Sequence, residues 1–282
     1  MSALLALALI AAPAFGQADW NLPQAPFQIF GNTYYVGPRG LSVILVTSDE
    51  GHVLIDAALP ESAGAVASSV RLLGFKVEDI RLIVNSHAHF DHAGAIAELQ
   101  RVSAATVAAT PWSASVLASG DAPRSDPQFG VLPPIARVTN IRAVSDGETL
   151  RVGPLAMTAH ETPGHTPGGT SWTWRSCDGN ACADLVYADS LTAVSADGFL
   201  FTRSRDYPNA LADFEKSFRT LETVPCGILL TPHPQASGLW ERVEHRDAGR
   251  IDAMKDPAAC RQYVERAREG LRKRVAAETD AR

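Results

Sequence analysis

Short runs of β-branched and aromatic residues, separated by Gly, Asn and Asp, follow one another along the first third of the chain. The runs "FQIFGNTYYVG", "LSVILVTSD" and "GHVLIDA" are typical of consecutive antiparallel strands, so the fold is expected to open with a meander. Residues 60–74 begin with Pro, end on Gly and repeat apolar side chains at spacings of three and four, which predicts a helix. The run "IRLIVNS" that follows predicts a buried strand.

The rest of the chain alternates helical and strand patterns. A polar, Pro-rich stretch at 121–134 predicts a surface loop. The other expected elements are, in chain order, a helix at 93–101, the strand "ATVAAT", strands from Thr149 to Thr162, from Gly169 to Arg175 and from Asp184 to Ala188, a helix at 208–223, the strand "GILLTPH" and a helix at 257–278. No repeat or low-complexity linker divides the chain, so we expect one mature domain. Strand groups with helices between them predict an α/β sandwich of two sheets covered by helices.

The N-terminal segment "MSALLALALIAAPAFGQADW" contains a short apolar run followed by small residues and Pro13. The run is too short to cross a membrane. It predicts a secretory signal peptide, although no Lys or Arg precedes it. We expect residues 1–18 to be removed, with cleavage near Gly16 to Ala18, and residues 19–282 to form the mature domain. The mature protein is then expected in the periplasm, as a monomer without a membrane anchor.

Charge and cysteine content narrow the classes of partner and compartment. The net charge is −6, so the chain offers no basic field for binding nucleic acid. Its four cysteines are an even number in a chain with an export signal, which predicts disulfides rather than a zinc ribbon; buried free thiols are the alternative. Three connectivities are possible. A Cys177–Cys182 pair would close a small loop, and a Cys226–Cys260 pair would tie a strand to the C-terminal helix.

The segment "NSHAHFDHAG" places His87, His89, Asp91 and His92 within six positions, directly after the predicted buried strand. That end of a strand is where layered α/β folds usually carry their chemistry. Imidazole nitrogens and carboxylate oxygens are ligands for zinc. Burying so many of them without a metal would leave several polar groups without partners. The segment therefore predicts a metal site.

Two further histidines follow predicted strands: His165 in "ETPGHTPGG" and His233 in "LLTPHPQASG". A single histidine in such a turn is more often a hydrogen-bonded residue than a ligand, but these two complete a pair of three-ligand zinc sites. Two neighbouring ions can share a water and turn it into a hydroxide nucleophile near neutral pH. We interpret His52, His160 and His245 as structural or surface groups, with His160 close enough in sequence to support a ligand.

The motifs HxHxDH, "PGHTPGG", "YADSLT" and "TPHPQASGLW" together resemble those of the metallo-β-lactamase superfamily, and their combination resembles subclass B3. The resemblance implies an αββα four-layer sandwich. A B1 member would have cysteine at Ser190, and a B2 member would have asparagine at His87. The B3 pattern implies two zinc ions per chain, with His87, His89 and His165 holding the first and Asp91, His92 and His233 holding the second.

The resemblance also implies an activity. B3 enzymes hydrolyse the lactam amide of carbapenems, cephalosporins and penicillins with a metal-bridging hydroxide, which confers β-lactam resistance. Asp91 would then ligate the second zinc and orient the nucleophile, so it is the expected catalytic side chain. Ser190 and Thr192, two apart on an extended segment, are expected to donate hydrogen bonds to the substrate carboxylate. Gln128 resembles a substrate-contacting position in some relatives; a solvent-facing loop amide is the alternative.

Two other interpretations stand beside this one. Asp189 matches in kind the metal-bridging carboxylate of glyoxalase II-like and lactonase members, and an enzyme with that bridge would act on lactones or thioesters. We interpret Asp189 as a supporting residue, because "YADSLT" is closer to the B3 pattern. The fold could also carry a degraded site and act as a binding module, but the presence of all six ligands argues against this.

Overall fold

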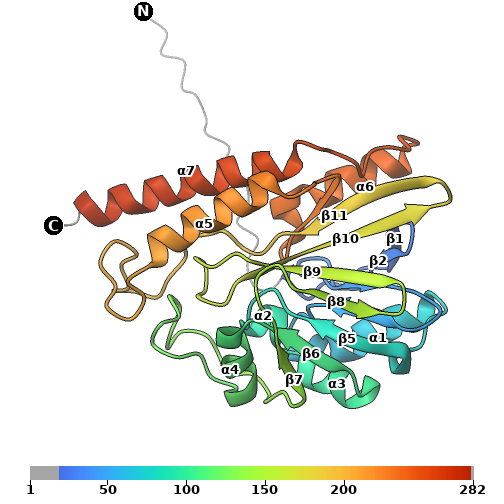
Figure 1. Ribbon diagram of the computed structural model, residues 1–282, viewed down its shortest axis with the longest axis horizontal. Helices are drawn as coiled ribbons and strands as arrows, with labels where there is room; N and C mark the ends of the chain where they lie inside the picture. Colours follow the sequence, from blue (N-terminus) through green and yellow to red (C-terminus); the bar gives the residue numbers. More distant parts are fainter. Residues whose placement is uncertain (1–18, 281–282) are drawn as a thin grey trace, which may run out of the picture.

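The computed structural model describes residues 19–280. The predicted signal peptide, residues 1–18, lies outside the described residues. Within them, no helix is both long enough and apolar enough to cross a membrane. The chain folds into two β-sheets that pack face to face, with helices on both outer sides (Figure 1).

The first sheet has seven strands in sequence order. Neighbouring strands are antiparallel from β1 to β4, which confirms the expected meander, and parallel from β4 to β7. The strands are β1 (Phe27–Phe30), β2 (Thr33–Tyr35), β3 (Ile44–Val46), β4 (His52–Ile55), β5 (Ile80–Val84), β6 (Thr106–Ala109) and β7 (Ile141–Ala143).

The second sheet has five strands in the order β12-β11-β10-β9-β8. Strands β8 to β11 are antiparallel neighbours, and β12 joins the edge parallel to β11. Its strands are β8 (Thr149–Val152), β9 (Leu155–Glu161), β10 (Thr170–Asp178), β11 (Ala181–Tyr187) and β12 (Ile228–Leu230).

Helices cover the outer face of each sheet (Figure 1). Helices α1, α3 and α4 lie on the first sheet, and α5 and α7 on the second, which gives the expected αββα sandwich. The α-helices are α1 (Ala63–Leu72), α2 (Phe90–Ala93), α3 (Ile96–Ser103), α4 (Pro111–Ser119), α5 (Ala210–Thr223), α6 (Leu239–Asp247) and α7 (Ala259–Asp280). The short 3₁₀ turns are η2 (Pro60–Ser62), η3 (Val77–Asp79) and η4 (Pro234–Ser237).

Alternate side chains of the inner strands enter different apolar layers. On β4, Val53 and Ile55 pack between the sheets, while Leu54 packs under the outer helices. On β11, Tyr187 points between the sheets and Val186 points toward α5 and α7. Because both faces are covered, the buried parts of these strands, residues 53–55 and 185–187, are continuously apolar instead of alternating with polar residues. Each fully buried aliphatic or aromatic side chain contributes roughly 1.5–3 kcal/mol relative to exposure.

The sequence-based boundaries need several corrections. The helix expected at 93–101 is two helices, α2 and α3, separated by a turn. The strand segment from Thr149 to Thr162 is the hairpin of β8 and β9, and β10 and β11 are both longer than expected. Helices α4 and α6 and the short strand β7 were not expected. The predicted loop at 121–134 contains no helix or strand.

The predicted disulfides form, and of the three possible connectivities the structure has Cys177–Cys182 with Cys226–Cys260, so no described cysteine is free. Cys177 and Cys182 are direct partners in the antiparallel pairing of β10 with β11. The Cys226–Cys260 bond joins the segment before β12 to the first turn of α7. The second disulfide therefore fixes the C-terminal helix to the second sheet.

Candidate metal centre

The histidine segment begins where β5 ends, and Asp56 holds it in place. Asp56 Oδ1 accepts hydrogen bonds from Asn85 Nδ2 at 3.0 Å and from the Ser86 backbone N–H at 2.7 Å. Its Oδ2 accepts hydrogen bonds from Ser86 Oγ at 2.6 Å and Tyr187 Oη at 2.8 Å. Asp56 itself has a φ of 57°, a left-handed conformation that costs of order 1–3 kcal/mol for such a residue. Both sheets thus fix the start of the segment through one buried carboxylate.

Two glycines allow the close backbone approaches that the centre needs. A Cβ at Gly94 would overlap the carbonyl oxygen of Phe90 and the ring of Pro60, so only glycine lets α2 pack against η2. A Cβ at Gly169 would overlap the carboxylate of Asp189. The histidine segment and the Asp189 side chain can therefore approach their neighbours without backbone displacement.

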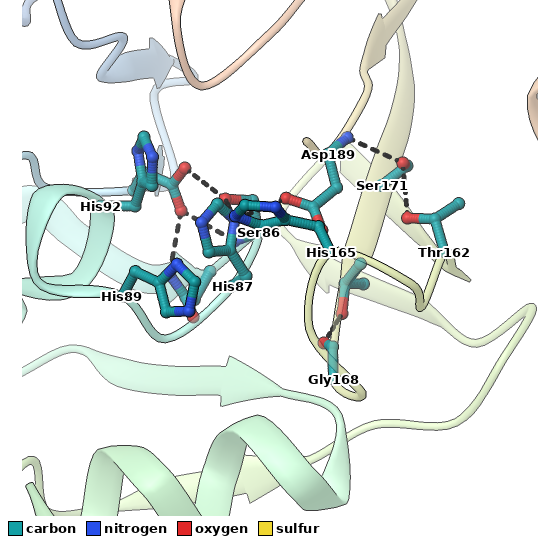
Figure 2. A network of polar contacts seen from close by, with 12 residues as sticks. Ser86, His87, His89, His92, Thr162, His165, Gly168, Ser171 and Asp189 are labelled. Carbon is teal, nitrogen blue, oxygen red and sulfur yellow. Dashed lines mark hydrogen bonds and ion pairs between the residues drawn. The ribbon is translucent and has the colours of Figure 1, made fainter. Parts of the chain in front are cut away.

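Three imidazoles from two loops form the first group. His87, His89 and His165 each offer one ring nitrogen, and these nitrogens lie within 4.8 Å of one another. The rings meet edge to face, with 4.8 Å between the ring centroids of His87 and His165 (Figure 2). His165 comes from the turn after β9, so the second sheet supplies one of the three. The structure brings together the residues that were expected to hold the first ion.

The far nitrogen of each imidazole bonds to an acceptor, which fixes the ring tautomer. His87 Nδ1–H donates to Asp189 Oδ1 at 2.7 Å, and His165 Nδ1–H donates to the backbone carbonyl of Thr192 at 2.9 Å. His89 Nε2–H donates to the carboxylate of Asp126 at 3.0 and 3.2 Å. The ring nitrogen that donates each of these hydrogen bonds must carry the proton. The other nitrogen of the same neutral ring therefore keeps a lone pair that can bind a metal.

Asp91, His92 and His233 form the second group. Asp91 Oδ2 lies 3.1 Å from His92 Nε2 and 3.4 Å from His233 Nε2. The ring centroids of His92 and His233 are 4.9 Å apart. The ligand atoms of His87, Asp91 and His92 also lie within 4.8 Å of one another, so His87 stands between the two groups. His233, which follows β12, closes the second group from the side of the second sheet.

The local environment favours the neutral form of His87 and His165 and the ionised form of Asp91. Burial lowers the pKa of His87 well below its usual value and lowers the pKa of His165 to about 3. Burial alone would raise the pKa of Asp91, but His92 and His233 together hold it well below its usual range. The pKa of His92 is raised, because the attraction of Asp91 exceeds the opposing effect of burial. Neutral imidazole and ionised carboxylate are the forms that bind metal ions.

Buried atoms without partners test whether the cluster fits a cation. His87 Nε2 is buried and has no hydrogen-bond partner, and the buried His92 Nε2 has only the carboxylate of Asp91 beside it, at 3.1 Å. Buried polar atoms in native proteins are normally paired, so free ring nitrogens beside an ionised carboxylate are expected where a metal ion binds. The donor set of nitrogen and carboxylate oxygen suits zinc among the common metals. The residues present therefore fit a metal centre.

Asp189 lies behind His87, on the side opposite the free nitrogens (Figure 2). Its backbone N–H donates to Ser171 Oγ at 2.9 Å, and its Oδ1 accepts the Nδ1–H of His87. Burial raises the pKa of Asp189 well above its usual value, and the nearby Asp56 raises it further. In this position Asp189 acts on the centre through the ring of His87.

The expected substrate-contacting residues line two adjoining cavities at the centre. One, of about 180 Å³, contains Gln128 and Thr192, and the other, of about 370 Å³, contains Ser190 and Thr192. His165 and His233 line both cavities. Gln128 Nε2 lies 3.4 Å from His89 Nδ1, so this side chain faces the centre instead of solvent. A larger cavity of about 660 Å³ lies elsewhere, around His52, and contains none of these groups.

Three residues at the centre were not anticipated. Asp126 and Asp56 are buried carboxylates that brace the histidine segment, and Trp20 packs its ring 5.2 Å from that of His233. The only sequence signal for Asp56 was its position at the end of the strand run "GHVLIDA". Asp126 lies two residues before Gln128, in a loop with no periodic pattern. Spacing alone could not pair Asp56 with Ser86 and Tyr187, or Asp126 with His89.

The other histidines do not join the centre. His52 is buried on β4, with its ring edge-on to Phe75, so it is a structural residue. His160 bonds Thr173 Oγ1 on the neighbouring strand at 2.8 Å instead of supporting a ligand. His245 is exposed on α6.

Comparison with known proteins agrees with this geometry. The family model described as the metallo-beta-lactamase superfamily matches residues 36–243. Rm3 metallo-β-lactamase is 56% identical with a TM-score of 0.92, and the match covers 93% of this chain and 97% of that one. MEM-A1, a subclass B3 metallo-β-lactamase isolated from a soil metagenome library, is 53% identical with a TM-score of 0.92, and the match covers 94% of this chain and all of that one.

Curated relatives are more distant. An uncharacterized protein of Bacillus subtilis, YobT, is 30% identical over 145 residues, which span 50% of this chain and 59% of that protein. A hydroxyacylglutathione hydrolase of Methylococcus capsulatus is 28% identical over 206 residues, which span 71% of this chain and 69% of that protein. The family model and the two solved relatives outweigh these partial matches, and the chain belongs to the metallo-β-lactamase superfamily, within its subclass B3.

Proposed function

We propose that this protein is a di-zinc β-lactamase that hydrolyses the lactam amide of carbapenems, cephalosporins and penicillins. The observation that carries the proposal is the pair of facing ligand groups, one of three imidazoles and one of Asp91 with two imidazoles. Each group matches the three protein ligands of a catalytic zinc site, which keeps a position for water or substrate. The B3 relatives support β-lactams as the substrate class.

The tautomers support a specific ligand assignment. His87 Nε2, His89 Nδ1 and His165 Nε2 would hold the first ion, because their other nitrogens donate hydrogen bonds. Asp91 Oδ2 and the Nε2 atoms of His92 and His233 would hold the second. When bound, zinc would polarise the lactam carbonyl and supply a water-derived nucleophile near neutral pH.

The remaining steps are the work of the chain's own residues. Asp91 would hold the second ion and, from that position, orient the nucleophile. The hydroxyls of Ser190 and Thr192 would donate to the substrate carboxylate, and both residues line the cavity beside His165 and His233. Gln128 would contact the substrate from the loop side. These polar contacts would hold the lactam carbonyl at the metal centre in one orientation.

The proposal includes the cellular setting. Residues 1–18 would direct export and be removed, and residues 19–282 would act in the periplasm as a monomer. Two disulfides support an oxidising compartment, because such bonds are rare in the cytosol.

A substrate panel tests the proposed function against its nearest alternative, hydrolysis of lactones or thioesters, which the hydroxyacylglutathione hydrolase relative favours. Zinc-loaded residues 19–282 would be assayed with a carbapenem, a cephalosporin, a penicillin, an acyl homoserine lactone and a glutathione thioester. We expect kcat/KM for at least one β-lactam to exceed that for the lactone and thioester by orders of magnitude. Turnover of the lactone or thioester with none of the β-lactams would transfer the assignment to that substrate class.

A further inference from the structure

Asp126 is a fully buried carboxylate, only 1% exposed, in the loop 121–134, where most residues are exposed or half-buried. We infer that Asp126 is a positioning residue for the first metal site, because its carboxylate fixes the ring of His89 and ties the loop to that ring. The inference rests on the proposed ligand role of His89. It assigns a task to a residue that lies outside both ligand groups.

The carboxylate of Asp126 contacts the His89 ring and the loop backbone at the same time. Its two carboxylate oxygens lie 3.2 and 3.0 Å from His89 Nε2. Its Oδ1 also accepts the backbone N–H of Gln128 at 2.8 Å. One side chain therefore connects a histidine of the segment after β5 with the backbone of a residue that lines the substrate cavity.

This contact decides which nitrogen of His89 faces the ion. A carboxylate accepts and cannot donate, so Nε2 must carry the proton and Nδ1 must keep the lone pair. His87 and His165 are turned the other way, with Nδ1 protonated, by acceptors that follow β11. Without Asp126, no described acceptor would hold the Nε2 proton of His89, and the ring could rotate or change tautomer.

The same carboxylate makes the loop part of the metal site. Gln128 Nε2 lies 3.4 Å from His89 Nδ1, the atom assigned to the ion. The backbone of Gln128 is held by Asp126 two residues before it. Loss of the carboxylate should therefore loosen the loop and weaken zinc binding together, although Asp126 itself touches neither zinc nor substrate.

Zinc affinity, measured by competition with a chromophoric chelator, tests the inference without relying on turnover. The proteins compared are the wild type, Asp126→Ala, Asp126→Asn and the control Asp121→Ala. Asp121 is exposed in the same loop, and its carboxylate makes no hydrogen bond or ion pair with residues 19–280. Asn keeps an amide oxygen that can accept the Nε2–H of His89, so it serves as the conservative rescue.

We expect Asp126→Ala to weaken binding of the first zinc about 10–100-fold, as is typical when the outer partner of a metal-ligating histidine is lost. Asp126→Asn should recover most of that affinity, and Asp121→Ala should equal the wild type. Equal affinity in Asp126→Ala and wild type would overturn the inference alone. An Asn variant as weak as the Ala variant would overturn the hydrogen-bond account. Failure of the wild type to bind zinc would instead refute the proposed function.

Limited trypsin digestion gives a second readout that a merely local ligand effect would not change. Arg124 is exposed in the loop and two residues from Asp126. In zinc-free protein, cleavage after Arg124, followed by mass spectrometry, should be several-fold faster in Asp126→Ala than in the wild type or Asp121→Ala. Equal cleavage rates in all three would show that Asp126 does not hold the loop.

Discussion

At the scale of single residues, the centre depends as much on the acceptors behind the imidazoles as on the imidazoles themselves. Asp189 and the Thr192 carbonyl lie in the segment after β11, Asp126 lies in the loop 121–134, and each accepts a hydrogen bond from one of the three rings. One ring nitrogen of each of the three histidines lies within 4.8 Å of the other two. A histidine without such a brace would have two competing tautomers, so the acceptors preorganise the site before any ion binds.

Asp91→Ala tests the second ligand group. The variant should retain about one zinc per chain instead of two and lose β-lactam turnover by more than about 100-fold, since even outer partners of metal ligands are worth 10–100-fold. Metal content and kcat/KM would be measured together, with thermal unfolding as the control for folding. A variant that loses one zinc but keeps wild-type turnover would contradict the two-ion account.

Ser190→Ala tests substrate anchoring. A hydroxyl bonded to a carboxylate remote from the reacting amide contributes mainly uniform binding, so KM should rise about tenfold while kcat changes little. Ser115→Ala, at an exposed serine of α4, provides the matched control. A fall in kcat with unchanged KM would show that Ser190 acts on the reaction itself and not on binding.

The sequence predicted the candidate ligands but not the residues that hold them in orientation. His87, His89, Asp91 and His92 are recognisable because they are crowded into one segment. Asp126 is 37 residues from His89, and its partner could not be read from spacing. Contacts of that kind depend on how the loop folds back, which local pattern does not encode.

At the scale of helices and strands, apolar patterning predicted the buried elements best. The inner strands form continuous apolar runs because both of their faces are covered. Helix α4, "PWSASVLAS", is rich in small residues and carries no clear stripe, and α6, "LWERVEHRD", has few apolar residues. Strand β7 is three mostly exposed residues that only the edge of the sheet defines. Tertiary contacts therefore decide these elements.

The last turn of α7 is held by Glu278, which is almost fully buried. Its carboxylate accepts the backbone N–H groups of Phe201 and Thr202 at 3.0 and 2.9 Å and bonds Arg274 at 2.6 Å. Glu278→Gln should lower the free energy of unfolding by about 1.5–3 kcal/mol at pH 7, since hydrogen bonds to a charged group are replaced by weaker ones. Denaturant unfolding measures this loss, and Glu269→Gln on the exposed face of α7 is the control.

The contribution of Glu278 should depend on pH in a defined direction. Burial would raise its pKa, but the hydrogen bonds from Thr202 and Arg274 lower it below the usual value. A carboxyl group whose pKa is lower in the folded state than in the unfolded state stabilises the protein at pH values above its unfolded-state pKa. This contribution to the free energy of unfolding is lost as pH falls through the folded-state pKa. The gap between wild type and Glu278→Gln should therefore shrink below about pH 4.5. A gap of equal size at pH 7 and pH 3.5 would contradict this assignment.

At the scale of the whole molecule, the centre exists only where the two sheets meet. The first sheet supplies the histidine segment after β5, and the second supplies His165, Asp189 and His233 from the ends of β9, β11 and β12. Asp56 and Tyr187 join the two sheets by a buried hydrogen bond beside the site. Local unfolding of either sheet edge would therefore separate the two halves of the metal centre.

The two disulfides should contribute unequally to this assembly. In the chain-entropy model, the 34-residue separation of Cys226 and Cys260 corresponds to about 4 kcal/mol and the five-residue separation of Cys177 and Cys182 to about 2 kcal/mol. Replacing Cys226 and Cys260 with serine should therefore lower the free energy of unfolding by more than replacing Cys177 and Cys182. Chemical denaturation of both double variants measures this difference, and a larger loss for Cys177–Cys182 would contradict it.

The proposed hydrolysis requires two metal ions, held by His87, His89, His165, Asp91, His92 and His233. The most direct test follows carbapenem turnover by residues 19–282 as purified, after removal of metal with a chelator, and after zinc is added back, with metal content measured at each stage. We expect two zinc ions per chain, loss of turnover with the metal, and its return as zinc is restored. Turnover that persists in metal-free protein, or none in protein carrying two zinc ions, would contradict the account.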